Sequence, residues 1–192
     1  MISVYKIILG VFAGSLILVV MVTQFLKPPQ IVAAQQVDGS STDETQPPIE
    51  IGDRTCIISD SYPAEILQWC NLIMTSAETY ALDPNLIAAL ILQESGGQAD
   101  AYSSSGAVGL MQVMPRDGIA ESFICINGPC FASRPLSSEL YNPQFNIEYG
   151  TRMLKNLYDK HGDLREALFA YGPMDIGYRY ADIVLNIYKN HN

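Results

Sequence analysis

The sequence predicts a mainly helical domain, preceded by an apolar segment and a linker. Three observations lead to this prediction. Helical signals dominate the stretch from about Cys56 to Asn192, strand signals are nearly absent from it, and twenty uncharged residues, Ile7 to Leu26, come well before it. The stretch shows no internal repeat, and its length is ordinary for one domain. We therefore assign residues 56–192 to a single helical domain.

The N-terminal segment, residues 1–27, is predicted to be a membrane anchor. Its uncharged run lies between Lys6 and Lys27, and at about 1.5 Å per residue it would extend roughly 30 Å, the thickness of a bilayer core. A cleaved signal peptide is the alternative, since residues 32–34 (Val-Ala-Ala) would pass as a cleavage site. The run is longer than a usual signal core, so we favour a single uncleaved transmembrane helix.

Residues 28–55 are predicted to form a disordered linker. This stretch is rich in proline, Gln, Ser and Thr, and no base balances its five acids before Arg54. Such a composition cannot bury enough apolar surface to fold. We expect a flexible tether that holds the domain away from the membrane.

The first two helices of the domain are predicted from apolar spacing and from capping residues. After Pro63, the apolar residues from Ile66 to Tyr80 recur on one face of a helix. Asp83 can cap the next helix, with Pro84 at its first position. Every residue from Leu86 to Leu92 is apolar, so this second helix should be buried on all sides until Ser-Gly-Gly at residues 95–97 ends it.

Three further helices are predicted near the C-terminus. Asn142 and Pro143 should open a helix that ends at Gly162. Asp163 should cap a helix from Leu164 to Tyr171, and residues 178–190 should form the last one. Between the two groups, residues 107–115 are expected to form a short helix closed before a proline, with small residues that allow close backbone approach.

The four cysteines are predicted to form two disulfides. Their spacing lacks the CxxC pattern of a metal or redox site, and four cysteines allow three pairings. Cys125 and Cys130 enclose a turn sequence, so we pair them with each other and pair Cys56 with Cys70. With a membrane segment upstream, disulfides imply an oxidising, extracytoplasmic compartment. Four free buried thiols are the alternative.

Glu94 is the leading candidate for a catalytic residue. It falls in the last turn of the buried helix, where the partial negative charge of the helix end and the shortage of water both favour a neutral carboxyl. Both effects should raise its pKa, as a general acid near pH 7 requires. The alternative is an exposed glutamate at a helix end, which is common.

The sequence offers little for other kinds of site. The two histidines, His161 and His191, lie at a helix end and in the tail, and no zinc, nucleotide or GxSxG pattern occurs. We therefore expect no metal and no cofactor. A net charge of −9 argues against nucleic-acid binding.

Four blocks of sequence together carry a family resemblance. They are Glu94-Ser95, SGAVGLMQVMP at residues 105–115, Ala-Tyr-Gly-Pro at 170–173 and Tyr-Ala-Asp-Ile-Val-Leu at 180–185. In this order they resemble the signatures of the soluble lytic transglycosylases, which are lysozyme-like enzymes of glycoside hydrolase family 23. The resemblance runs from about Pro63 to Tyr188 and implies a lysozyme-like fold that acts on the glycan strands of peptidoglycan.

The resemblance also implies a mechanism with one carboxylate. Glu94 would protonate the glycosidic oxygen and then accept the proton of the C6 hydroxyl of the same N-acetylmuramyl residue, which leaves a 1,6-anhydro end. The remaining implied roles concern the sugar and the orientation of the acid. Ser95 would help to orient the acid or the sugar, Gln112 and the backbone near Gly109 would bind acetamido groups, Met111 would pack beneath the sugar, and Tyr171 and Tyr180 would direct hydroxyls at Glu94 and an acetamido group.

One position departs from the family pattern, and it concerns the sugar subsites rather than the acid. The family usually has Ala-Tyr-Asn-x-Gly where this chain has Ala-Tyr-Gly-Pro, so Gly172 replaces an asparagine, and Asp175 in the following loop is a candidate to replace it in part.

A lysozyme-type hydrolase would need a second carboxylate to hold water, such as Asp117. Asp100, Glu121 and Asp175 are the other candidates for that role, and none of the four lies in a convincing setting. A catalytically silent module that binds glycan or scaffolds a membrane assembly is the third reading.

Overall fold

The structure of the chain is a computed structural model that describes residues 55–191. These residues belong to the second of two units into which the chain divides, Glu50–Asn192. The predicted anchor, residues 1–27, and nearly all of the predicted linker, residues 28–55, lie outside the described residues and stay predictions. Within residues 55–191, no helix combines the length and the apolar character needed to cross a membrane.

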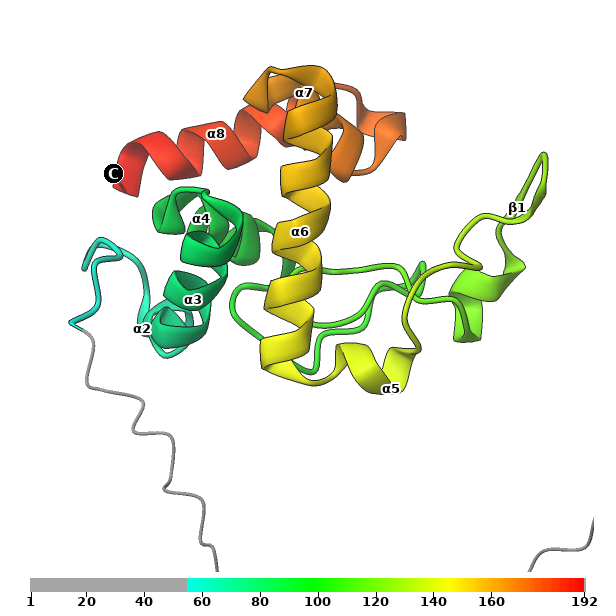
Figure 1. The fold of residues 1–192 in the computed structure, drawn as a ribbon, viewed down its shortest axis with the longest axis horizontal. Coiled ribbons are helices and arrows are strands. Elements are labelled where there is room, and N and C mark those ends of the chain that lie inside the picture. Colours follow the sequence, from blue (N-terminus) through cyan, green and yellow to red (C-terminus); the bar gives the residue numbers. More distant parts are fainter. Residues whose placement is uncertain (1–54, 192) are drawn as a thin grey trace, which may run out of the picture. The chain divides into compact units, whose positions relative to one another are not determined.

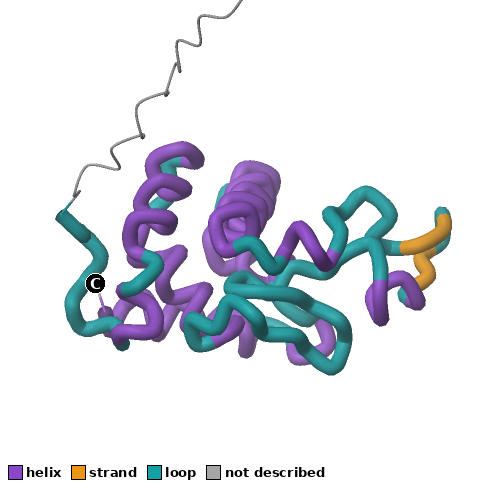
Figure 2. Tube along the Cα trace, turned by 90° about the horizontal axis from the view of Figure 1, so that it is seen from below, coloured by secondary structure: helices purple, strands orange, loops and turns teal. Residues whose placement is uncertain are grey.

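The described residues are mainly helical, which confirms the predicted class (Figures 1 and 2). Their elements follow one another as α2 (Ala64–Leu67), α3 (Cys70–Tyr80), α4 (Pro84–Ser95), η1 (Gly118–Ser122), β1 (Ile124–Cys125), β2 (Gly128–Pro129), α5 (Ser137–Leu140), α6 (Pro143–His161), α7 (Leu164–Tyr171), η2 (Met174–Ile176) and α8 (Arg179–His191).

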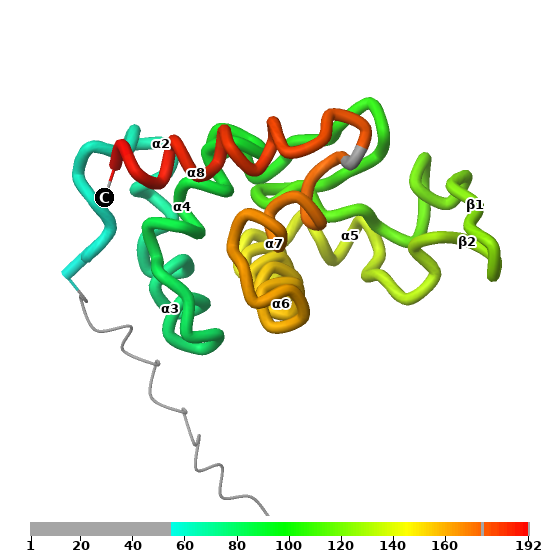
Figure 3. Tube along the Cα trace, turned by 90° about the horizontal axis from the view of Figure 1, so that it is seen from above, coloured from blue at the N-terminus to red at the C-terminus, as the bar shows by residue number. Residues whose placement is uncertain are grey.

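Helix α4 forms the centre of the core. It lies between α3 and α8 (Figures 1 and 3) and packs against both. All six residues from Leu86 to Ile91 are buried, so the helix has no solvent-facing side along this stretch, as the sequence predicts. A fully buried Leu or Ile side chain contributes roughly 1.5–3 kcal/mol through the hydrophobic effect. This packing fixes the C-terminal end of α4 in space.

Capping residues set the helix boundaries where the sequence places them. The Asp83 carboxylate accepts a hydrogen bond from the Asn85 amide at 2.8 Å, and Asn142 accepts one from the Phe145 amide at 3.0 Å. At the start of α7, the Asp163 carboxylate accepts a hydrogen bond from the Glu166 amide. Helices α4 and α6 end because Gly96 and Gly162 have φ of 63° and 70°, a left-handed conformation that glycine adopts without strain.

The predicted helix after Pro63 is broken into α2 and α3. The break falls at Gln68 and Trp69, where the Trp69 indole N–H donates to the Gly97 carbonyl at 2.9 Å. A Cβ on Gly97 would lie 2.2 Å from the Glu65 carbonyl oxygen, so glycine lets α2 approach the chain just after α4. This contact joins segments that are distant in the sequence, so the apolar spacing after Pro63 does not reveal it. It supports the end of α4.

The prediction of a helix over residues 107–115 is wrong. Val108 and Val113 exchange backbone hydrogen bonds at 3.0 and 3.1 Å, and the residues between them form a tight turn. Gly109 and Gln112 have φ of 77° and 45°, which a right-handed helix does not allow. The turn is fastened by Asn146 of α6, whose amide donates to the Val108 and Leu140 carbonyls and accepts from the Met111 amide.

The structure contains both expected disulfides, Cys56–Cys70 and Cys125–Cys130. The second closes the antiparallel hairpin of β1 and β2, which is the strand pair seen among the described residues. This hairpin belongs to an insertion, residues 116–136, between the turn and α5. It projects at the end of the domain opposite α2 and the C-terminus (Figures 1 and 3).

Candidate active site

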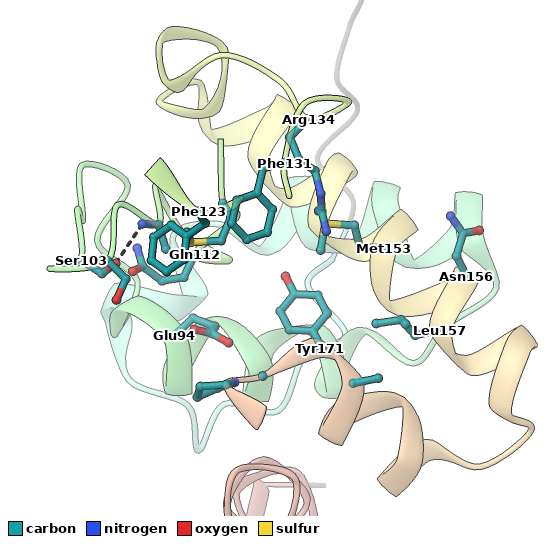
Figure 4. Close-up of a pocket in the computed structure, with 16 residues that line it drawn as sticks. Glu94, Ser103, Gln112, Phe123, Phe131, Arg134, Met153, Asn156, Leu157 and Tyr171 are labelled. Carbon is teal, nitrogen blue, oxygen red and sulfur yellow. Dashed lines mark hydrogen bonds between the residues drawn. The ribbon is translucent and has the colours of Figure 1, made fainter. Parts of the chain in front are cut away.

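A cleft of about 800 Å³ opens beside the C-terminal end of α4 (Figure 4). Its walls come from that helix end, from residues 103–114, from the insertion, from α6 and from the segment around the end of α7. Figure 4 shows Glu94 and Tyr171 facing the cleft from below, and Phe123, Phe131 and Arg134 facing it from the insertion above. Glu94 is the only carboxylate that lines the cleft in residues 55–191.

Glu94 lies in the last turn of α4, partly buried at the cleft wall. Burial raises the pKa of its carboxyl to about 7, and a hydrogen bond from Tyr180 opposes this rise only in part. A carboxyl with this pKa is protonated in a large fraction of molecules near neutral pH. It can therefore donate a proton and later take one back.

Tyr180, near the start of α8, holds the Glu94 carboxyl. Its hydroxyl donates a hydrogen bond to Oε1 of Glu94, and its side chain is only 4% exposed. Burial, and next the charge of Glu94, raise the pKa of this phenol well above its ordinary value. Tyr180 thus stays a neutral donor and restrains the orientation of the carboxyl.

Tyr171 joins the end of α7 to the turn at residues 109–112. Its hydroxyl donates to the Met111 carbonyl at 2.9 Å while its ring lines the cleft. Burial, and next the charge of Glu94, raise the pKa of the Tyr171 phenol well above its ordinary value. The phenol is therefore neutral near pH 7, and its hydroxyl fixes backbone rather than pointing at Glu94 as a free donor.

Gln112 lines the cleft, and Ser95 does not. The Ser95 hydroxyl donates to the Leu110 carbonyl at 2.9 Å and lies outside the lining, so Ser95 ties the end of α4 to the turn. Gln112 lines the cleft, and its amide nitrogen donates to the Gly109 carbonyl at 3.0 Å and to the Ala101 carbonyl at 3.3 Å. The structure thus brings Gln112, but not Ser95, to the cleft surface.

Met111 and Gly109 support the turn from its buried side. The Met111 side chain is fully buried against Gly150 of α6, and Met114 lines the cleft instead. A Cβ on Gly109 would lie 2.3 Å from the Asn146 amide nitrogen, so glycine is needed there for close approach to α6. Both residues shape the floor of the cleft without lining it.

All residues that line the cleft lie within a stretch of the chain that matches a known protein family. The model of the transglycosylase SLT domain matches residues 71–174, which include Glu94, the turn and the whole insertion. The chain belongs to this family.

Several curated relatives are similar to about half of this chain. A membrane-bound lytic murein transglycosylase E of Buchnera aphidicola is 39% identical over 92 residues, which are 48% of this chain and 40% of the relative. An endo-type membrane-bound lytic murein transglycosylase A of Citrobacter koseri is 37% identical over 98 residues, 51% of this chain and 46% of the relative. A transglycosylase of phage PRD1 is 36% identical over 105 residues, 55% of this chain and 34% of the relative.

These matches span less than half the length of each relative. Among solved structures, the 70 kDa soluble lytic transglycosylase SLT70 of Escherichia coli is 25% identical, with a TM-score of 0.45. That similarity covers 68% of this chain and 20% of the other.

The other acidic residues considered from the sequence do not line the cleft of the SLT domain. Asp117 accepts hydrogen bonds from the Ser137 amide at 2.8 Å and from its hydroxyl at 2.9 Å. The bond from the Ser137 amide is the main reason that the pKa of Asp117 lies below its usual value. Asp117 therefore fastens the insertion to α5, and Asp100, Glu121 and Asp175 are exposed outside the cleft.

Several residues of the site are absent from the predictions made from the sequence. Asn146 fastens the turn, and its signal was a lone amide side chain within the apolar face of α6. Phe123, Phe131 and Arg134 line the cleft from the insertion, a segment without helical or strand periodicity. No local pattern in the sequence indicates which way these three side chains point.

Gly172, the departure from the family pattern, lies directly against Tyr180. A Cβ on Gly172 would lie 2.2 Å from Cδ1 and 2.5 Å from Cγ of the Tyr180 ring. The backbone of Gly172 has φ of −79° and ψ of −175°, which any residue adopts, so glycine is required here for space and not for conformation. The missing side chain thus gives Tyr180 the room from which it reaches Glu94.

We expect Gly172→Ala to lower both stability and activity of the SLT domain. The added methyl must displace a buried ring, which costs about 1–3 kcal/mol, and the displaced Tyr180 hydroxyl no longer holds Glu94. On peptidoglycan, the substrate that the family resemblance implies, loss of this alignment should reduce the rate by about 10- to 100-fold. Thermal unfolding and turbidity assays measure the two effects.

Tyr180→Phe is the matched control for this prediction. It keeps the ring that clashes but lacks the hydroxyl. In the Tyr180→Phe background, Gly172→Ala should still destabilise the protein, yet should reduce activity little further. Unchanged stability and activity of Gly172→Ala would contradict the proposed contact.

Proposed function

We propose that the SLT domain is a peptidoglycan lytic transglycosylase. It cleaves the β-1,4 bond between N-acetylmuramic acid and N-acetylglucosamine and leaves a 1,6-anhydro-N-acetylmuramic acid end. The observation that carries the proposal is Glu94, the single carboxylate of the cleft within residues 55–191, with a pKa near neutrality. The names of the curated relatives, lytic murein transglycosylases, support the same substrate and reaction.

The proposed reaction uses Glu94 twice. The protonated carboxyl gives its proton to the glycosidic oxygen as the bond from that oxygen to C1 of the muramic residue breaks. The C6 oxygen of the same residue then forms a bond to C1, and its proton passes to the Glu94 carboxylate. The carboxyl is restored and no water is consumed. Intramolecular attack needs no group to hold water, since well-oriented groups reach effective molarities of up to about 10⁵–10⁸ M.

The other side chains of the site are proposed to position these groups. Tyr180 orients the Glu94 carboxyl through its hydrogen bond. Gln112 offers its amide oxygen to an acetamido N–H, because its amide nitrogen is already engaged with backbone carbonyls. Tyr171 acts through the Met111 carbonyl and holds the turn. Met111 is fully buried, so Met114, which lines the cleft, is proposed in its place to pack beneath a sugar.

We also propose that the domain works outside the cytoplasmic membrane. Residues 1–27 would anchor it by one helix, and residues 28–55 would give it reach towards the glycan. Two disulfides within the described residues support an oxidising compartment. Two of the relatives carry the words membrane-bound in their names, which agrees with an anchored enzyme.

Mass spectrometry of the products tests the proposed reaction. Purified peptidoglycan digested with the protein should yield muramic ends that are lighter by one water than hydrolysed ends. Glu94→Gln protein processed in parallel controls for contaminating activity. Predominantly hydrated, reducing ends would instead indicate a lysozyme-type hydrolase with Glu94 as its acid. A folded protein that releases no fragments would indicate a silent glycan-binding or scaffolding module.

A further inference from the structure

The insertion supplies one whole wall of the cleft. Phe123 and Phe131 flank the disulfide-closed hairpin and pack edge to face with ring centroids 6.0 Å apart. Arg134 follows three residues later, and its amide donates to the Phe131 carbonyl at 2.9 Å. All three line the cleft, so the insertion presents two aromatic rings and one cation to the substrate (Figure 4).

Arg134 is the only cationic side chain of the cleft lining in the described part of the chain. Its guanidinium donates to the sulfur of Met153 and lies 5.9 Å from the ring centre of Tyr149. Across residues 55–191, no carboxylate lies within ion-pair distance of it, although the chain carries twenty acids and eleven bases. A thioether is a weak acceptor, so the guanidinium keeps strong donors for another partner.

Arg134 shares the cleft with Glu94. Burial does most to raise the pKa of the Tyr171 phenol, the charge of Glu94 raises this pKa further, and the charge of Arg134 lowers it. The phenol therefore lies within electrostatic range of both charged groups. Figure 4 places the ring of Tyr171 in the region between these two side chains. A glycan strand with its scissile bond at Glu94 would therefore pass close to the guanidinium.

We propose that Arg134 binds a carboxylate of the substrate and makes the enzyme select acidic glycan strands over neutral ones. The proposal rests on the proposed function, which supplies the substrate class. Guanidinium and carboxylate form a charge-assisted pair with two parallel hydrogen bonds. In peptidoglycan the carboxylate has two sources. One is the lactyl group of a muramic residue without peptide, and the other is the stem peptide.

Binding to Glu94→Gln protein tests the proposal without depending on turnover. The probes are peptide-free murein oligosaccharides, the same strands with stem peptides, and neutral N-acetylglucosamine oligomers. Arg134→Gln should weaken binding of one or both acidic probes by about tenfold or more, because hydrogen bonds to charged groups are strong. The neutral probe should bind as before. The acidic probe that loses affinity identifies the source of the carboxylate.

Arg152→Gln is the matched control. Its guanidinium lies 4.8 Å from the centre of the same Tyr149 ring, but it does not line the cleft. The control changes the net charge equally and should leave all three affinities unchanged. Arg134→Lys should restore part of the affinity for acidic probes and confirm a role for charge.

Two results would overturn the inference. In the first, Arg134→Gln weakens the binding of neutral and acidic probes equally. In the second, it weakens the binding of neither acidic probe. Neither result bears on the muramic ends released by wild-type protein, so this inference and the proposed function can fail separately.

Discussion

Glu94→Gln is expected to lower wall-clearing activity by at least about 100-fold without changing the fold. General acid–base catalysis contributes about 10²- to 10⁴-fold, and here one carboxyl is proposed to serve both proton transfers. Glutamine has the size of glutamate, and its amide oxygen can still accept the hydrogen bond from Tyr180. It has no proton that it can give to a glycosidic oxygen.

Initial rates on purified peptidoglycan, together with circular dichroism, measure this effect. Glu121→Gln makes the same chemical change at an exposed glutamate outside the cleft and should keep full activity. A folded Glu94→Gln protein with more than a tenth of wild-type activity would exclude Glu94 as the catalytic acid.

The helix boundaries could be predicted because local residues decide them. Asp83, Asn142 and Asp163 cap helices with their own side chains, and Gly96 and Gly162 end helices through their own backbone. Each signal acts within about four residues of the boundary that it sets. The place of Glu94 at the end of a buried helix followed from such signals alone.

The turn at residues 109–112 could not be predicted in the same way. Its apolar sequence is compatible with a helix, and what prevents one is the side chain of Asn146, which satisfies the turn's backbone from α6, 35 residues beyond Met111. The orientation of Arg134 depends likewise on Met153 and Tyr149 of α6. Contacts of this range leave no periodic pattern in either segment. The place of Glu94 could therefore be predicted from the sequence, and the opposite wall of the cleft could not.

The burial that is proposed to prepare Glu94 for catalysis should also make the folded protein less stable at high pH. The pKa of its carboxyl rises from an ordinary 4.5 to about 7 on folding. Between these values the folded state keeps a proton that the unfolded state has lost, so the free energy of unfolding falls as pH increases. A shift of this size lowers the free energy of unfolding by up to about 3 kcal/mol, and this decrease is complete above pH 7.

Glu94→Gln removes this titration, so the difference in unfolding free energy between variant and wild type isolates it. Other carboxylates with shifted pKa values, such as Asp117 and Asp182, titrate equally in both proteins and cancel. The variant should gain stability over wild type from pH 4.5 to 7 and keep a constant advantage above that range. Urea unfolding at pH 4, 6 and 8.5 measures the difference. Parallel stability curves would mean that Glu94 ionises as readily in the folded protein as in the unfolded chain, and that burial does not prepare it as the acid.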